Sequence, residues 1–262
     1  MKAKNILAAL LMMTVGLQTA KAQKIVMVLT TTDNEVMEFD VMKIKDVSFR
    51  ESSSVENDWV DLGLPSGTKW ATCNIGASKP EEYGDYFAWG EISSKDYFDW
   101  GNYKWVNKTE PSWSQINKYT INDGQLEACW YDSNGKFIGD KKTELDTEDD
   151  AAVVILGGGW RMPSHGQMKE LVDNCTRQWT TQNGVNGILV TGPNGKTIFL
   201  PASGYRAGFD LNDAGSYGGY WTSSLGEGYS TFGALCLNFN SSEWKVSMNA
   251  RNCGFSVRPV RP

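Results

Sequence analysis

Histidine is almost absent from this chain, which has a single one, His165, in 262 residues. Protein sites for zinc and for non-haem iron usually draw several ligands from histidine, so the sequence offers little for either metal. A serine-histidine-acid triad would depend on the same residue. The neighbouring Ser164 is expected beside it at the start of a helix, where adjacent side chains point apart. We therefore expect no catalytic residues and interpret the protein as a non-enzyme.

Positive charge is also in short supply. Lysine and arginine together number 25 against 31 aspartates and glutamates, which gives a formal net charge of -6. Nucleic-acid binding depends on clustered lysine and arginine side chains that neutralise phosphates, and the sequence contains no such cluster. We expect no nucleic-acid partner.

Long apolar runs are missing as well, since spanning a bilayer takes about 20 residues. The longest run, residues 6–15, follows two lysines and is succeeded by the small-x-small pattern Ala20-Lys21-Ala22. This order predicts a signal peptide at residues 1–22, with an inner-membrane anchor as the alternative. No cysteine lies near the cleavage site, so a lipoprotein is not expected. We expect an exported protein, periplasmic, on the outer surface or secreted, with no transmembrane segment.

Cysteine is sparse and odd in number, and no two cysteines have the C-x-x-C spacing of a zinc or redox site. In an exported protein such a count predicts one or two disulfides and a leftover thiol. Cys73 follows an early strand and Cys175 ends a helix, so we expect these two to pair. Cys236 and Cys253 lie on late strands and form the second expected pair. Cys129 remains as the free thiol.

Glycine and aromatic residues are abundant, with 27 Gly and 11 Trp, which favours short strands joined by tight turns. Residues 23–50 alternate between apolar and polar around Asp33-Asn34, a pattern typical of a β-hairpin. The segment 51–58 is rich in serine and has the composition of a linker. The main domain is expected at residues 59–262.

Two helices are expected in this main domain. The first opens at Thr147, whose hydroxyl would cap the helix while Asp150 reaches back to it. The second opens at Ser164, with Gln167 completing a capping box and an apolar face that begins at Met168.

Three motifs follow one another in the main domain: Gly-Trp-Arg-Met-Pro-Ser at 159–164, Gly-Tyr-Trp-Thr-Ser-Ser at 219–224 and Gly-Phe-Ser-Val-Arg-Pro-Val-Arg at 254–261. Together they resemble the formylglycine-generating (sulfatase-modifying factor) branch of the C-type-lectin-like fold. With segments 60–71 and 82–90 they resemble more closely the Fibrobacter succinogenes major paralogous domain of bacterial surface proteins. The resemblance covers the chain from Trp59 to its end.

The resemblance implies an α+β fold, a C-type-lectin-like domain with antiparallel sheets, two helices and long loops, preceded here by the small β-hairpin module. It also implies that the first strand near Val60 pairs with the last near Val257. Formylglycine-generating enzymes hold copper with a closely spaced cysteine pair, whereas Cys236 and Cys253 lie 17 positions apart. That enzymatic activity is therefore not expected, although a diverged enzyme of this type stays open as an alternative.

An acidic run precedes the first expected helix. It consists of Asp146, Glu148, Asp149 and Asp150. Clustered carboxylates are ligands that calcium prefers, so calcium is a possible cofactor here. Negative side chains in the first turn of a helix also interact favourably with its dipole, which accounts for the same run without a metal. Otherwise we expect no cofactor.

An aromatic loop lies between the early strands and the first helix. Its rings are Phe98, Trp100, Tyr103, Trp105, Trp113, Tyr119, Trp130 and Tyr131. Such rings stack on sugars and anchor protein interfaces, and binding sites concentrate on loops. We expect ligand-binding residues at Trp100, Tyr103, Trp105 and Trp113, with Trp100, Trp105 and Trp113 as the main anchors, joined by Tyr205, Arg206 and Tyr217. The alternative is that the rings cover the core of the domain.

The sequence therefore predicts an exported, non-enzymatic binding or adhesion protein that recognises a glycan or a surface protein through its aromatic loop. A structural subunit of a surface assembly is the other alternative to a diverged enzyme.

The predicted signal peptide can be tested directly. Because Ala20-Lys21-Ala22 matches the pocket of a signal peptidase, the exported protein is expected to begin at Gln23. N-terminal sequencing of the protein recovered from outside the cytoplasm checks this, and an exported form that begins at Met1 would contradict it.

Overall fold

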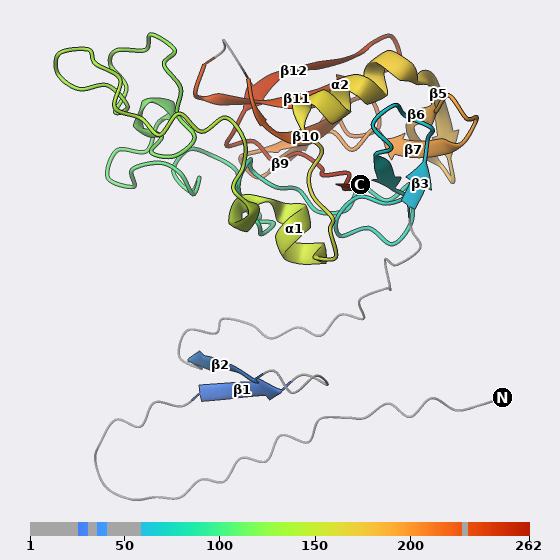
Figure 1. Ribbon diagram of the computed structural model, residues 1–262, viewed down its shortest axis with the longest axis horizontal. Helices are drawn as coiled ribbons and strands as arrows, with labels where there is room; N and C mark the ends of the chain where they lie inside the picture. Colours follow the sequence, from blue (N-terminus) through green and yellow to red (C-terminus); the bar gives the residue numbers. More distant parts are fainter. Residues whose placement is uncertain (1–25, 31–35, 41–58, 227–229) are drawn as a thin grey trace, which may run out of the picture. The chain divides into compact units, whose positions relative to one another are not determined.

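The computed structural model describes residues 26–30, 36–40, 59–226 and 230–262 (Figure 1). The chain divides into two units, Met1–Ser52 and Ser53–Pro262. The predicted signal peptide 1–22 and linker 51–58 lie outside the described residues. In the first unit, β1 (Val26–Thr30) pairs antiparallel with β2 (Val36–Asp40), which confirms the predicted hairpin.

The second unit is built mainly from short strands. They are β3 (Trp59–Asp61), β4 (Lys69–Ala71), β5 (Thr176–Gln182), β6 (Val185–Thr191), β7 (Thr197–Pro201), β8 (Tyr205–Ala207), β9 (Asp210–Asn212), β10 (Gly218–Leu225), β11 (Gly233–Phe239), β12 (Trp244–Ala250) and β13 (Val260–Arg261). They form the sheets β5-β6-β7, β10-β11-β12 and β13-β4-β3 and the pair β8-β9, and neighbours in each are antiparallel.

The two α-helices of the described residues are α1 (Ala151–Leu156) and α2 (His165–Asn174), and two short 3-10 segments occupy Trp113–Gln115 and Thr147–Asp149. The mixture of antiparallel sheets with two helices confirms the α+β class. None of the helices in this part of the chain has the length and hydropathy that a membrane crossing requires.

The terminal strands pair differently from the expected arrangement. β4 lies between β3 and β13, so Trp70 faces Val60 on one side and Val260 on the other. The implied direct pairing of the strand near Val60 with the one near Val257 is therefore wrong. Trp70 is fully buried on this central strand and packs in the first core cluster with Val60 and Val260 of the neighbouring strands. The carbonyl of Val257 instead accepts from the amide of Ile75.

The second helix confirms its predicted start. The Ser164 hydroxyl accepts from the Gln167 amide, and the Gln167 side chain accepts from the Ser164 amide, which completes a capping box. The first helix begins later than predicted. Asp150, not Thr147, is its N-cap and accepts from the amides of Ala152 and Val153. Because the Asp150 carboxylate also accepts from the Met162 amide, it is fixed from both sides and sets the start of α1.

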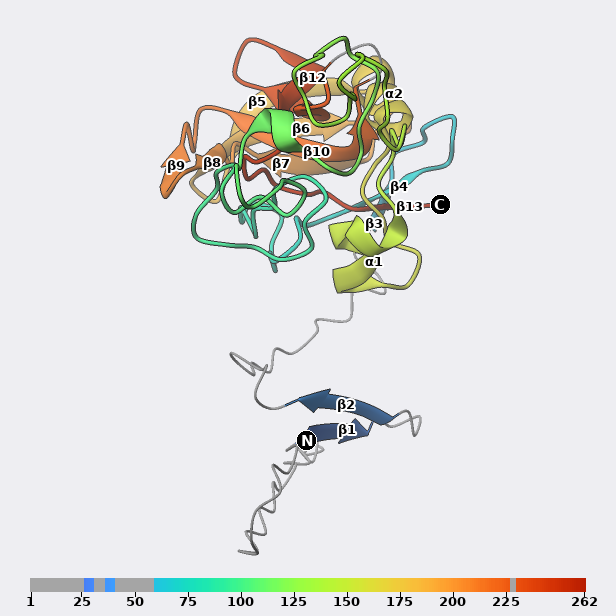
Figure 2. The same ribbon diagram turned by 90° about the vertical axis from the view of Figure 1, so that its left-hand side faces the viewer.

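Three clusters of buried side chains form the core of the second unit. The first lies between α2 and the sheets, where Met168 and Leu171 pack on the side chains of β6, β7 and β11. The second contains Trp89 and Trp221 beside α1. The third lies beneath the aromatic loop, which forms the long green connection to the left of the sheets in Figure 1 and in front of them in Figure 2.

A buried guanidinium joins the sheet regions of the second unit. Arg258 is 1% exposed and donates to the Asn74 side chain (2.8 Å) and to the carbonyls of Ala71 (3.0 Å), Thr72 and Phe199 (3.0 Å). Burial lowers the pKa of Arg258, and the nearby Tyr220 opposes this. These acceptors lie on β4, on the segment after it and on β7, so Arg258 holds the three together through one buried side chain.

Arg258→Lys is expected to lower the free energy of unfolding by about 3 kcal/mol, because an ammonium cannot reproduce the planar fork and leaves buried carbonyls unpaired. Urea denaturation of the parent and the variant measures the difference. Arg161→Lys, at an exposed position, is the control and should remain within about 0.5 kcal/mol of the parent. Equal stability of the two variants would contradict the role of the buried fork.

Candidate functional site

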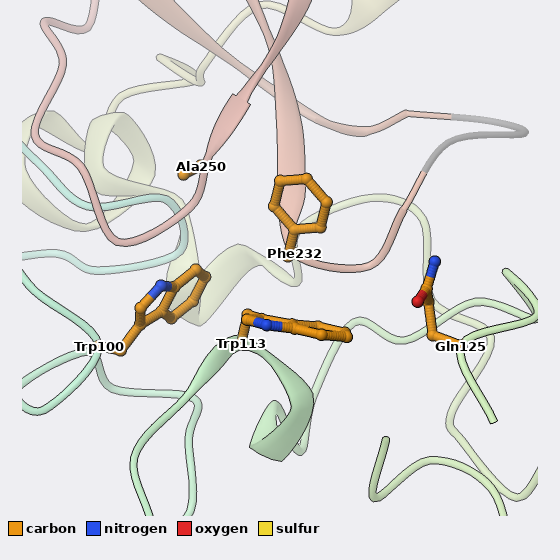
Figure 3. A pocket seen from close by; sticks show the side chains of 5 residues that line it. All are labelled: Trp100, Trp113, Gln125, Phe232 and Ala250. Carbon is orange, nitrogen blue, oxygen red and sulfur yellow. The ribbon is translucent and has the colours of Figure 1, made fainter. Parts of the chain in front are cut away.

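An open pocket lies on the aromatic loop of the second unit. It has a volume of about 350 Å³ and is lined by Trp100, Trp113, Gln125, Phe232 and Ala250. Figure 3 shows the three rings arranged around a common space, with the Gln125 amide at one side and Ala250 at another. The lining thus combines three aromatic rings, one methyl group and one amide, and carries no charged side chain.

Each ring of the pocket rests on another aromatic side chain. Trp113 lies in the 3-10 segment, where it packs edge-on against Trp130 (centroids 6.4 Å apart) and against Phe232 (6.3 Å). Trp100 packs edge-on against Tyr103 at 5.6 Å. Since Trp130 and Tyr103 are buried, the walls of the pocket are supported from below.

A second buried guanidinium, Arg251, ties together the segments that carry these rings. It is fully buried and donates to the Tyr103 hydroxyl (2.9 Å) and to the carbonyls of Lys118 (2.9 Å), Tyr119 (2.9 Å) and Thr231 (3.1 Å). Its own amide donates to the carbonyl of Phe232. One side chain therefore connects two parts of the aromatic loop, at Tyr103 and at 118–119, to the strand segments that bear Ala250 and Phe232.

The Arg251 guanidinium is also enclosed by aromatic rings. It lies 4.8 Å from the Trp89 centroid, 5.5 Å from that of Tyr103 and 5.9 Å from that of Tyr119. A desolvated cation over ring faces gains electrostatic stabilisation, which partly offsets the cost of burying its charge.

Asp123 fixes the polar side of the pocket. Its carboxylate accepts from the amides of Gln125 (3.2 Å) and Thr231 (2.7 Å) and from the Trp130 indole (3.1 Å). Burial would raise the pKa of Asp123, but these hydrogen bonds outweigh it and hold the pKa below the usual value. Asp123 is thus ionised at neutral pH and links Gln125 to the strand segment before Phe232.

The structure brings together only some of the predicted binding residues. Trp100 and Trp113 line the pocket, whereas Tyr103 is fully buried and donates its hydroxyl to the Trp89 carbonyl. Trp105 donates its indole N–H to the Gly90 carbonyl and packs edge-on against Tyr119. The expectation that Tyr103 belongs to the exposed surface is corrected, because its ring is buried beneath the loop. Trp105 is half-buried, packs against the core clusters and is not among the residues that line the pocket.

Tyr205, Arg206 and Tyr217 lie away from the pocket lining as well. Tyr205 stacks on Phe255 with centroids 5.7 Å apart and meets Tyr217 edge-on at 6.1 Å. The Arg206 guanidinium lies 5.2 Å from the centroid of Tyr86. The Tyr217 hydroxyl donates to Asn238. These three side chains are partly buried within the sheet region and do not extend the pocket.

The sequence analysis missed Phe232, Gln125 and Ala250. Phe232 immediately precedes β11, more than 100 positions after Trp113, so no local pattern connects the two rings. The available signal was an isolated phenylalanine directly before a continuous apolar strand. Gln125 and Ala250 carry no comparable sequence signal.

The acidic run forms a network of ion pairs with lysine side chains. Carboxylate oxygens of Asp146, Glu148 and Asp149 come within 4.8 Å of one another. Lys118 contacts both Asp146 (2.8 Å) and Asp149 (2.6 Å). Lys104 contacts Asp149 at 2.8 Å, and Lys142 contacts Asp146 at 2.6 Å. With ammonium groups on two of the three carboxylates, the arrangement fits ion pairing better than calcium ligation.

The fourth member of the run is also committed elsewhere. Both Asp150 oxygens accept amide hydrogen bonds, so the side chain is not available to a metal at this cluster. Hydrogen bonds from Lys118 and Lys142 lower the pKa of Asp146 to about 2. Burial would raise the pKa of Asp149, but hydrogen bonds from Lys104, Lys118 and Tyr119 outweigh it and lower this pKa.

Neither predicted disulfide is formed. Cys175, Cys236 and Cys253 are thiols, and burial raises the pKa of Cys175 to about 11 and that of Cys236 to about 12. The strand register explains why Cys236 and Cys253 do not pair, because Ser247, and not Cys253, lies opposite Cys236. Cys129 is an exposed thiol that donates to the Ile116 carbonyl at 3.0 Å.

Asp149→Asn is expected to lower the free energy of unfolding by about 3 kcal/mol at neutral pH, because it removes a buried carboxylate from two ammonium groups. The pKa of Asp149 is depressed in the folded state, so its contribution is present above the unfolded pKa of about 4 and is lost as the pH falls through the folded value. The difference between parent and variant should therefore shrink below about pH 4.

Urea denaturation across this pH range provides the measurement. Asp173→Asn is the matched control, since Asp173 pairs with Lys169 on the exposed surface of α2 and should contribute less than about 1 kcal/mol. A difference for Asp149→Asn that persists unchanged in acid would contradict the charge network.

A function can be argued only from the pocket and the residues that support it, because comparison with known proteins gives no relative. No protein-family model, curated protein or solved structure matches this chain. The resemblance to the Fibrobacter succinogenes major paralogous domain therefore stays a prediction that rests on segments 60–71 and 82–90 and on the motifs at 159–164, 219–224 and 254–261.

Proposed function

We propose that this protein is an exported, non-enzymatic binding protein that recognises an uncharged sugar residue of a surface glycan in the pocket formed by Trp100, Trp113 and Phe232. The observation that carries the proposal is the pocket lining, which presents three supported rings and an amide and no charge. Aromatic faces bury the C–H faces of a sugar, and a few fixed polar groups orient such a ligand.

The placement of Gln125 supports a polar but neutral ligand. A primary amide offers both donor and acceptor groups, which is what sugar hydroxyls require. The backbone of Gln125 is held by the Asp123 carboxylate, so the segment that carries the amide is anchored at the edge of the pocket. An anionic ligand would find no lysine or arginine on the pocket wall.

The surroundings of the single histidine favour a binding protein over a hydrolase. The Ser164 hydroxyl caps α2, and the Ser224 hydroxyl lies between the His165 amide and the Glu144 carboxylate. His165 itself is exposed in the first turn of α2. Neither serine is hydrogen-bonded to the imidazole, which a nucleophile activated by histidine requires.

Trp113→Ala is the variant that tests the pocket. Because Trp113 forms one of its walls, we expect the affinity for the recognised glycan to fall by about 2 kcal/mol or more, as at a binding hot spot. A glycan array identifies the ligand of the parent, and calorimetric titration compares the two proteins.

Trp105→Ala is the matched control, since it removes the same indole from the supporting layer. It is expected to lower the free energy of unfolding by about 3 kcal/mol while the folded protein still binds. A Trp113→Ala protein that binds like the parent would refute the pocket as the site. A parent that carries a redox metal and turns over substrate would favour a diverged enzyme, and a parent that binds only its own assembly would favour a structural subunit.

A further inference from the structure

A pair of exposed rings lies close along the chain to the pocket. Phe209 is 73% exposed and Tyr97 is 36% exposed, and their centroids are 4.4 Å apart with a tilt of 44° between the planes. Both rings expose apolar surface to water, Phe209 far more than Tyr97, and neither belongs to the three core clusters. Their exposure therefore has no explanation in the stability of the fold.

The backbone holds this pair rigidly. Phe209 is the second residue of the two-residue turn between β8 and β9, and Gly208 before it has a φ of +59°, as the first position of a type II′ turn requires. Phe98 and Gly208 exchange two backbone hydrogen bonds, of 2.9 and 2.8 Å. The turn is thus fastened to the segment that carries Tyr97, and the two rings meet without a mobile linker.

The same segment leads directly to the pocket wall. Trp100 follows Tyr97 by three positions, so their Cα atoms are at most about 11 Å apart. A closed turn fixes this stretch, because Asp99 and Asn102 bond to each other's amides and the Asn102 side chain donates to the Tyr97 carbonyl. Tyr97 is therefore held within about 11 Å of the backbone of Trp100 on the pocket wall, a separation that a short oligosaccharide can span.

The charge beside the pair is negative. Asp99 lies next to the Tyr97 hydroxyl, where its charge and hydrogen bond raise the pKa of Tyr97, and Asp210 directly follows Phe209. Lys95 and Arg206, the nearest cations along the chain, are engaged with Glu91 and with the ring of Tyr86. Carboxylates accept hydrogen bonds from sugar hydroxyls, whereas they repel phosphate and anionic lipid surfaces.

We propose that Tyr97 and Phe209 form a second stacking platform for a neutral sugar residue, so that the protein recognises an extended glycan through the platform and the pocket together. This inference rests on the proposed function of the pocket. The expected ligands are neutral oligosaccharides and polysaccharides, and not single sugars.

The experiment is a titration with neutral oligosaccharides of increasing length from the polymers that the parent binds, taken from cellulose, xylan, mannan, laminarin and starch. Phe209→Ala should weaken the binding of the longest oligomers at least about tenfold, while the shortest oligomer that binds keeps the parent affinity. Trp113→Ala should weaken the binding of all lengths.

Ile138→Ala serves as the matched control, because it removes an apolar side chain that is 58% exposed elsewhere in the aromatic loop, and it should bind every oligomer like the parent. Thermal unfolding of Phe209→Ala should coincide with that of the parent, since the ring is exposed. An unchanged melting temperature would show that the variant is folded and that its weaker binding is due to the missing ring.

Three results would overturn the platform. If Phe209→Ala binds oligomers of every length with the parent affinity while Trp113→Ala loses binding, the pocket is the binding site and the platform is refuted. If the parent binds none of the saccharides, both fall together. If the parent instead binds a lysine-rich peptide in a manner that depends on Phe209, the carboxylates beside the rings recognise a basic protein segment and not a glycan.

Discussion

The buried guanidinium of Arg251 is the interaction on which the arrangement of the aromatic loop depends. A charged group without solvent is stable only if its hydrogen-bonding groups are satisfied, and Arg251 meets this with three carbonyls and a tyrosine hydroxyl. Those acceptors belong to parts of the chain far apart in sequence. Because a long loop with little regular structure cannot fix its own shape through ladders, this polar anchor replaces the missing backbone pairing.

A buried arginine that donates several hydrogen bonds occurs twice among the described residues of the second unit. Arg258 joins strand segments much as Arg251 joins the loop, and in both cases the acceptors are neutral oxygens. The two arginines follow β12 closely, near the end of the chain. A loop anchored in this way is preorganised, so a ligand of the pocket would not have to order the rings when it binds, and little affinity is lost to conformational entropy.

Local patterns in the sequence were sufficient for α2, whose cap and apolar face depend on neighbouring residues alone. They also indicated the antiparallel pairing of β1 with β2. They failed where contacts outside the local segment determine the role of a residue. Asp150 is the cap of α1 because the Met162 amide, twelve positions later, also donates to it. Trp105 supports the loop because it contacts Gly90 and Tyr119. The eleven tryptophans look alike in sequence, and only packing separates those of the core from those of the pocket.

The position of Arg251 also bears on the order of folding. The chain is synthesised from its N-terminus, so the aromatic loop emerges long before the residue that anchors it. Contacts between residues separated by more than 130 positions close late, because bringing distant segments together costs entropy first. Until Arg251 is in place, Trp89, Tyr103 and Tyr119 lack their central partner. An intermediate without this anchor exposes aromatic surface and is prone to aggregation.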